Sequence, residues 1–277
     1  MERIAQCVKA CPRSDLAGIL EAVGNAALEA GGILRSLYGK PHTITHKGTI
    51  DLVTEADVAS EKAVLAILEK TRPDAAVLAE ESHAGYQEEC TGPAWIIDPL
   101  DGTTNFAHNF PWFAVSIAFV DEGKSQVGVI YSPMQDELFC ACRGCGAWLN
   151  GRPITVSGSK TLQQSLVATG FPYAIHENST NVMAVLGEVL PRVQGVRRAG
   201  AAALDLANVA CGRFEGFWEI LLKPWDTAAG ILLVEEAGGR VSDFSNNAYT
   251  PFVPEILASN GHVHDELAAI LGRFSRR

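Results

Sequence analysis

The sequence lacks the features that mark several classes of protein. None of its apolar runs approaches the roughly 20 residues that a membrane-spanning helix needs. Residues 1–13 are interrupted by charges and hold no apolar segment of signal-peptide length. Basic residues are outnumbered, 22 Lys and Arg against 32 Asp and Glu, and a net charge of −10 argues against an extended surface for nucleic acid or anionic lipid. We therefore expect a cytoplasmic protein with no membrane contact and no direct nucleic-acid binding.

Cysteine is also scarce, with seven in 277 residues. An odd number spread thinly over the chain fits a reducing compartment better than a disulfide framework. The one close group is Cys140-x-Cys142-x-x-Cys145, and nothing nearby supplies the fourth ligand of a zinc site. We interpret these cysteines as ordinary strand and turn residues. The chain is 47% hydrophobic, which is ample for a sizeable core.

The pattern of apolar residues divides the chain into two halves. The first half is predicted to contain helices at 14–34 and 54–72, a polar loop at 42–50, strands at 75–79 and 94–97, and an antiparallel meander over 113–150. The second half alternates strands near 166–169, 214–219, 241 and 256–258 with helices near 182–190, 201–210 and 227–237 and a last helix ending near 271. We expect an α+β fold with subdomains 1–155 and 156–277 and no flexible linker.

The strongest chemical signal is the segment Trp95–Phe106, WIIDPLDGTTNF. A buried strand is predicted to end at Asp98, where Pro99 forces a turn. Asp98 and Asp101 are therefore expected close together on a loop rather than on opposite faces of a strand. The residues after Gly102 can open a helix or turn whose free N–H groups suit an anion. Two carboxylates at such a place would repel a phosphate unless a divalent metal lay between them.

Other acids are placed to join this site. Glu80 ends the neighbouring strand, Asp57 lies in the first turn of a helix, and Asp226 precedes a helix predicted to start at Thr227. Oxygen ligands in this number, without His or Cys, favour Mg²⁺. The residues alone thus predict Mg²⁺-dependent phosphate chemistry. Singly, each acid has an ordinary alternative: a capping-box acid at Asp57, an N-cap at Asp226 and a solvated strand end at Glu80.

Four motifs in register resemble those of the inositol monophosphatase family. They are Asp51–Thr54, Ala79–Ser82, Trp95–Phe106, and Trp225–Gly230 followed by Glu235–Gly239. The resemblance runs from about residue 16 to 270. It implies a layered αβαβα sandwich, usually a homodimer, and a lithium-sensitive phosphomonoesterase that cleaves myo-inositol monophosphates with a metal-activated water. Two or three Mg²⁺ ions per subunit are implied with it.

The resemblance also implies a role for each site residue. Glu80, Asp98 and the carbonyl of Leu100 would hold one Mg²⁺, and Asp98, Asp101 and Asp226 a second. A third, looser ion would lie by Glu80, on the side of the loop that carries Lys47. Glu80, Asp57 and Thr103 would serve catalysis, the last two by orienting or activating the attacking water. Substrate would contact Gly102, Thr103, Thr104, Gly200, Ala201, Ala202, Glu219 and Asp226, with Glu219 accepting an inositol hydroxyl.

Two alternatives stay open. The same site could act on fructose 1,6-bisphosphate, histidinol phosphate or a 3′-phosphoadenosine nucleotide. Some bacterial members of the family are also adaptors in transcription antitermination. Arg197 and Arg198 would be a natural contact patch for that role, although two arginines are more often a solvated strand end. A Rossmann oxidoreductase is not supported, because the glycines at 144 and 146 are followed by Leu149 where a third glycine is needed.

Overall fold

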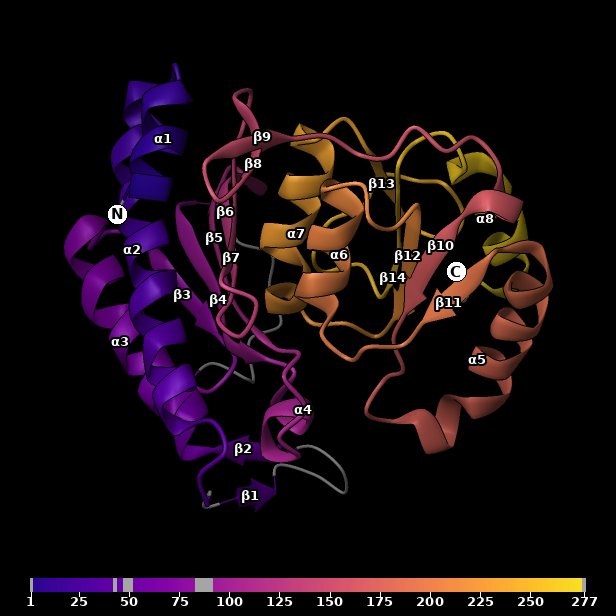
Figure 1. The fold of residues 1–277 in the computed structure, drawn as a ribbon, viewed down its shortest axis with the longest axis horizontal. Helices are drawn as coiled ribbons and strands as arrows, with labels where there is room; N and C mark the ends of the chain where they lie inside the picture. Colours follow the sequence, from indigo (N-terminus) through magenta and orange to yellow (C-terminus); the bar gives the residue numbers. More distant parts are fainter. Residues whose placement is uncertain (1, 42–43, 47–51, 83–91, 276–277) are drawn as a thin grey trace.

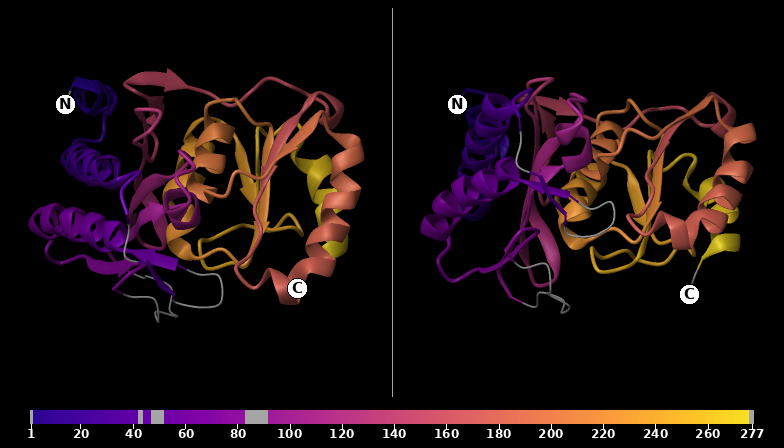
Figure 2. Two further views of the ribbon diagram at one scale, coloured as in Figure 1. Left: turned by 60° about the horizontal axis from the view of Figure 1, so that its bottom comes forward. Right: turned by 90° about the horizontal axis from the view of Figure 1, so that it is seen from below.

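The chain folds into five alternating layers of helix and sheet (Figure 1). The computed structural model describes residues 2–41, 44–46, 52–82 and 92–275. Three helices form the first layer, a seven-stranded sheet the second, two helices the third, a five-stranded sheet the fourth, and two further helices the fifth. The two turned views in Figure 2 show the same succession of layers. The predicted α+β sandwich is therefore confirmed.

The first half of the chain builds the outer helices and the larger sheet. Its helices are α1 (Glu2–Ala10), α2 (Ser14–Leu37), α3 (Glu55–Thr71) and the short α4 (Thr103–Ala107). The sheet runs in the order β3 (Ala76–Ala79), β4 (Ala94–Asp101), β5 (Ala114–Asp121), β6 (Lys124–Ser132), β7 (Glu137–Cys142), β8 (Gly146–Leu149) and β9 (Arg152–Ile154). From β4 to β9 every pairing is antiparallel, so the predicted meander is confirmed.

Four elements of this half were not predicted: α1, β1, β2 and β9. Helix α1 buries Ile4 and Cys7, but its nine residues are fewer than the roughly 11 to 18 over which a helical period is recognised. Part of the expected polar loop is instead a strand, β1 (Ile44–His46), which pairs with β2 (Leu52–Thr54) in a small antiparallel ribbon. The rest of that loop, including Lys47 and Asp51, lies outside the described residues.

The second half builds the smaller sheet and the helices on both its faces. The strand order is β11 (Gly195–Arg197), β10 (Leu166–Thr169), β12 (Gly216–Ile220), β14 (Glu255–Ser259) and β13 (Arg240–Ser242). Helices α6 (Ala202–Ala210) and α7 (Pro224–Glu236) lie between the two sheets, and α5 (Ile175–Val189) and α8 (His264–Leu271) cover the outer face. Subdomains 1–155 and 156–277 stay a prediction. Among the described residues, no helix has the length and apolar character needed to cross a bilayer.

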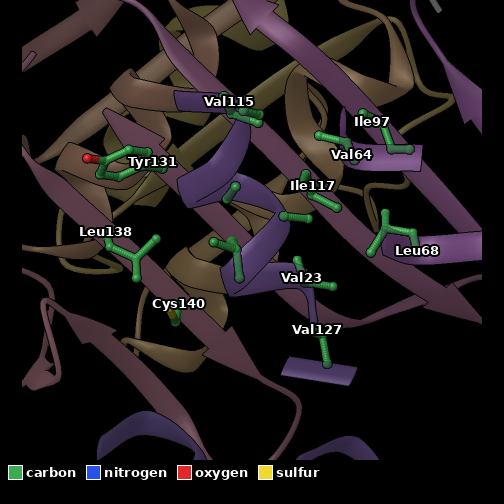
Figure 3. Close-up of a cluster of buried hydrophobic side chains, with 14 of the residues drawn as sticks. Val23, Val64, Leu68, Ile97, Val115, Ile117, Val127, Tyr131, Leu138 and Cys140 are labelled. Carbon is green, nitrogen blue, oxygen red and sulfur yellow. The ribbon is translucent and has the colours of Figure 1, made fainter. Parts of the chain in front are cut away.

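The larger sheet is covered by apolar side chains on both faces. Figure 3 shows Val23 of α2 and Val64 of α3 among side chains from β4 to β7, such as Ile117. On the opposite face, residues such as Ala118 pack toward α6 and α7. Each large apolar side chain fully buried in this way contributes about 1.5–3 kcal/mol. Strand β4, which carries the acidic motif, is thus held rigidly between β3 and β5.

Helix α7 packs unusually close to the larger sheet. A Cβ added at Gly128 of β6 would lie 2.8 Å from the carbonyl oxygen of Ala229 on α7. Near the start of the same strand, the Ser125 hydroxyl donates a 2.7 Å hydrogen bond to the carbonyl of Ala228 on α7. This close approach fixes the helix whose first turn carries Asp226.

We expect Gly128→Ala to destabilise the protein by about 1–3 kcal/mol, because the new methyl meets backbone and α7 must shift. Chemical denaturation measures the change in the free energy of unfolding. Gly158→Ala is the matched control, since nothing lies within 4 Å of its added Cβ, and it should change stability by less than about 0.5 kcal/mol. Equal stability of the two variants would contradict the close packing.

Candidate metal and phosphate site

A cavity of about 310 Å³ opens where the two halves of the chain meet. Strand β4 with helix α4, the start of α6, strand β12 and the first turn of α7 all contribute to its wall. Every predicted metal ligand and substrate contact lines this cavity: Glu80, Asp98, Leu100, Asp101, Gly102, Thr103, Thr104, Gly200, Ala201, Ala202, Glu219 and Asp226. Asp57 does not line it and lies behind Thr103.

Asp98 and Asp101 are brought together by an irregularity within a strand. The expectation that the strand ends at Asp98 and that both acids lie on a loop was wrong, because β4 continues to Asp101. Asp98 pairs with Ser116 of β5 and Asp101 with Ala114, so β4 carries one extra residue between them. Residues three apart on a regular strand point to opposite faces, and the extra residue of a bulge corrects this. Pro99, which has no N–H to donate, is compatible with such an interruption.

The turn after Asp101 depends on glycine. Gly102 has a φ of 94°, in the left-handed region, and precedes α4 as its N-cap. A Cβ there would also lie 3.1 Å from the carbonyl oxygen of Trp112. The predicted helix start at Thr103 is confirmed. Gly102 therefore allows the chain to turn directly from the second acid into the threonine pair.

Asp57 both caps helix α3 and contacts Thr103 of the site. Its Oδ2 accepts hydrogen bonds from the backbone N–H of Thr54 at 2.8 Å and from the Thr54 hydroxyl at 2.7 Å, which completes a capping box. Its Oδ1 lies 3.0 Å from the hydroxyl of Thr103, which is also 3.0 Å from the carbonyl oxygen of Leu100. Burial raises the pKa of Asp57, and the hydrogen bonds from Thr54 and Thr103 oppose that rise. Asp57 is therefore a capping-box acid and a neighbour of the site at the same time, and the two interpretations are compatible.

Asp226 occupies the third position of α7. The prediction that the helix starts at Thr227 was wrong, and so was the alternative of an N-cap at Asp226, because α7 begins at Pro224. Proline is favoured at the first helical position, where its missing N–H has no partner to lose. Oδ2 of Asp226 accepts a 2.7 Å hydrogen bond from the backbone N–H of Lys223, which fixes the carboxylate at the cavity wall.

The acids of the cavity raise one another's pKa values. Burial is the largest cause of the raised pKa of Asp98, followed by the charges of Glu80, Asp101 and Asp226. Burial also raises the pKa of Asp101 to about 7, against the hydrogen bond that the backbone N–H of Ala203 donates at 2.8 Å. Among the described residues, five carboxylates and two cations, Arg198 and Lys223, line the cavity. Oxygen donors in this excess fit a hard divalent cation such as Mg²⁺, which would offset their repulsion.

The far side of the cavity carries a further buried acid, Glu219. Burial raises its pKa, as do the charges of Asp226 and Asp205, whereas Arg198 lowers it. The guanidinium of Arg198 lies 4.9 Å from the centre of the Phe171 ring. Both residues line the cavity, and so does Tyr173. Phe171 and Tyr173 gave no chemical signal in the sequence, because they belong to an irregular segment with no motif.

Comparison with known proteins identifies close relatives over most of the chain. The model of the inositol monophosphatase family matches residues 15–275. An inositol-1-monophosphatase of Synechocystis is 46% identical over 260 residues, covering 93% of this chain and 90% of the relative. A protein of Escherichia coli named Nus factor SuhB is 41% identical over 267 residues, covering 92% and 99%. The crystal structure of the extragenic suppressor protein SuhB of Bartonella henselae superimposes with a TM-score of 0.86 at 43% identity, covering 91% and 98%.

We expect Asp98→Asn to abolish the stabilisation that Mg²⁺ gives to the protein. Without metal, the variant should unfold at the same temperature as the wild type or higher, since a source of buried repulsion is gone. With Mg²⁺, the wild type should gain several degrees and Asp98→Asn should gain none, because an ion bound by the folded state alone shifts the unfolding equilibrium. Thermal unfolding over a Mg²⁺ titration measures both. The control is Asp74→Asn, a surface acid paired with Arg72, and an Asp98→Asn protein that responds to Mg²⁺ as this control does would contradict the site.

Proposed function

The chain belongs to the inositol monophosphatase family, and we propose that it is a Mg²⁺-dependent phosphatase that hydrolyses myo-inositol monophosphates to inositol and phosphate. The observation that carries the proposal is the convergence of Glu80, Asp98, Asp101 and Asp226 on one cavity beside the Gly102–Thr104 turn. Phosphatase activity is supported by the family as a whole and by the Synechocystis relative named inositol-1-monophosphatase. The inositol substrate and the metal are our inference.

The acidic wall of the cavity would hold two or three Mg²⁺ ions. One is assigned to Glu80, Asp98 and the carbonyl of Leu100, and a second to Asp98, Asp101 and Asp226. The third would lie by Glu80. When bound, these ions would neutralise the phosphate charge and polarise the attacking water. Asp98 is the one residue assigned to two ions.

Thr103 and Asp57 are arranged to orient a water and to take up its proton. The Thr103 hydroxyl donates to Oδ1 of Asp57 at 3.0 Å, which leaves the lone pairs of its oxygen directed at other donors. A water in the cavity can donate to that oxygen, and its proton can pass through the hydroxyl to the carboxylate. The raised pKa of the buried Asp57 favours uptake of the proton. The capping box holds Asp57 in place during this step.

Recognition of the leaving group is assigned to the opposite wall. Glu219 lies near the end of β12 and lines the cavity. Its carboxylate can accept hydrogen bonds from a polyol. The backbone of Gly200, Ala201 and Ala202 lines the same wall. Arg198 balances part of the charge of Glu219, as its effect on the Glu219 pKa indicates. A sugar alcohol, with many hydroxyls and no charge of its own beyond the phosphate, fits this combination of groups.

Three further properties belong to the same proposal. We infer that the protein is a homodimer, that it works in the cytoplasm on a small-molecule phosphate ester, and that Li⁺ inhibits it at the site of the second ion. The support for these properties is the family membership alone.

A second candidate function is an adaptor role in transcription antitermination, favoured by relatives named Nus factor SuhB at 41% identity. Both arginines of the suggested patch are exposed. Arg197 ends the edge strand β11, and Arg198 also lines the cavity and lies over Phe171. An Asp101→Asn protein separates the roles, since it should lose phosphatase activity and keep any antitermination activity.

We expect inositol 1-phosphate to have a higher kcat/KM than fructose 1,6-bisphosphate, histidinol phosphate or 3′-phosphoadenosine 5′-phosphate. Glu219→Ala should lower kcat/KM for inositol 1-phosphate by roughly 10- to 100-fold, the loss of a charge-assisted hydrogen bond of about 1.5–3 kcal/mol. Activity on p-nitrophenyl phosphate, whose leaving group has no hydroxyl to bind at Glu219, should hardly change. Steady-state kinetics with all five esters measure this.

Two results would count against the proposal. If both inositol 1-phosphate and p-nitrophenyl phosphate lose activity equally, Glu219 has a structural role only. If neither loses activity, or another ester has the highest kcat/KM, the cavity is not built for inositol.

A further inference from the structure

Three cysteine thiols meet at a place remote in sequence from the acidic motif. The sulfur of Cys11 lies 2.9 Å from that of Cys145 and 3.3 Å from that of Cys142. All three sulfurs lie within 4.8 Å of one another. The sequence pattern showed Cys142 and Cys145 without further ligands, because Cys11 is more than 130 positions away. In the folded chain this third thiol is brought to the other two.

Local structure aims the three thiols at one point. Cys11 follows the last turn of α1, Cys142 ends β7, and Cys145 lies in the turn that joins β7 to β8. The turn is closed by a 2.9 Å hydrogen bond from the backbone N–H of Cys145 to the carbonyl of Cys142. Helix α1 is docked on the sheet through Arg3, whose guanidinium makes two hydrogen bonds to the Asp136 carboxylate, at 2.8 and 2.6 Å.

A second pair of thiols lies on the same two elements. Cys7 precedes Cys11 by one helical turn, and Cys140 precedes Cys142 by two strand positions, so each pair shares a face. The Cys7 thiol donates a hydrogen bond to the carbonyl of Arg3 at 3.3 Å, and the nearness of Cys7 and Cys140 lowers the pKa of Cys7 and raises that of Cys140. A second pair of thiols therefore lies close to the cluster.

We propose that Cys11, Cys142 and Cys145 form a binding site for a thiophilic divalent cation of the Zn²⁺ type, with water as the fourth ligand. Thiolates are preferred ligands of Zn²⁺, and three protein ligands with an open fourth position are a known arrangement. Zn–S bonds of about 2.3 Å at tetrahedral angles place sulfurs about 3.8 Å apart, so the observed distances need to open by less than about 1 Å. A disulfide would use two of the thiols and leave the third without a role.

Burial and charge at the cluster suit a divalent ion. Cys11 and Cys142 are buried, whereas Cys145 is half-buried, which gives an ion a route from solvent and the fourth ligand a place. Three thiolates around a divalent ion carry a net charge of −1, and a monovalent ion would leave −2 in the same buried position. The guanidinium of Arg13, which pairs with Asp15 at 2.6 Å, lies near the thiols and would offset part of the charge of the thiolates.

Binding is balanced by proton release. Burial raises the pKa of Cys142 and of Cys145, and a thiol binds a metal as its thiolate. The ion therefore forms three metal–sulfur bonds and releases up to three protons, and its affinity falls as the pH is lowered.

The ion would tie α1 to a turn that α7 holds from the other side. In that turn, the guanidinium of Arg143 pairs with Glu235 at 2.6 Å. The backbone N–H groups of Gly144 and Gly146 each donate a 2.8 Å hydrogen bond to the carboxylate of Glu236. The role we infer is structural: the ion fixes α1 to the turn between β7 and β8 of the larger sheet.

The test is Co²⁺ binding to the full-length protein, reduced and freed of metal by a chelator. We expect one thiolate-bound Co²⁺ per chain, seen as a near-ultraviolet sulfur-to-metal charge-transfer band, and loss of the band when Zn²⁺ is added. Carboxylate oxygens give no such band, so the acidic cavity does not contribute. The band should be lost in Cys11→Ser, Cys142→Ser and Cys145→Ser and kept in Cys211→Ser, the control variant of a cysteine outside the cluster.

A measurement on the wild-type protein tests the site even if the cysteine variants fail to fold. Zn²⁺ should slow alkylation of Cys145 at least tenfold and leave alkylation of Cys211 unchanged, as measured by mass spectrometry. Absence of the charge-transfer band in the wild type, its survival in Cys11→Ser, or alkylation of Cys145 at an unchanged rate would each overturn the proposal.

Discussion

Mutual repulsion among buried carboxylates is the constraint on which the rest of this structure depends. Asp98 is 2% exposed and Asp101 8% exposed, and Glu80 and Asp226 lie close enough to raise the pKa of Asp98. A buried charge without a partner costs several kcal/mol, so such a group of acids requires either protonation or a cation. The fold does not separate these acids to relieve the repulsion. It uses a bulge, a left-handed glycine and a capping box to hold them together.

The larger sheet and α7 provide the rigidity that this arrangement needs. Strand β4 is an inner strand, and both faces of its sheet are covered by apolar side chains. Helix α7 approaches β6 at Gly128 so closely that a methyl group would collide with its backbone. Asp98 and Asp226 therefore come from two elements that cannot move apart without disturbing the core. A functional site built on packed elements in this way keeps its geometry when the charges inside it change.

The order and spacing of the acidic motifs were sufficient to predict that Glu80, Asp98, Asp101 and Asp226 share one cavity, whereas Asp57, predicted with them, lies behind Thr103. Their local geometry was harder to predict. The strand that continues through Pro99 to Asp101 depends on pairing with β5, which no local pattern reports. The start of α7 at Pro224 was missed because the helix was traced from its apolar residues rather than from its proline.

Two further features could be found only in the folded chain. Arg198 is exposed, as a surface patch requires, but its position at the cavity over Phe171, a residue of a distant segment, gave no signal in the sequence. Cys11 joins Cys142 and Cys145 through the docking of α1, a helix of nine residues that was not predicted. Both features depend on contacts between residues far apart in the sequence rather than on local propensities.

The central claim is that a divalent metal converts a cavity that repels anions into one that binds phosphate. Isothermal titration of inorganic phosphate into the protein, with saturating Mg²⁺ and after removal of metal, tests this claim most directly. The account predicts that phosphate binds with Mg²⁺ and that no binding is measurable without it, because the described part of the chain lines the cavity with five carboxylates and two cations. Phosphate binding of equal affinity in both conditions would contradict the account.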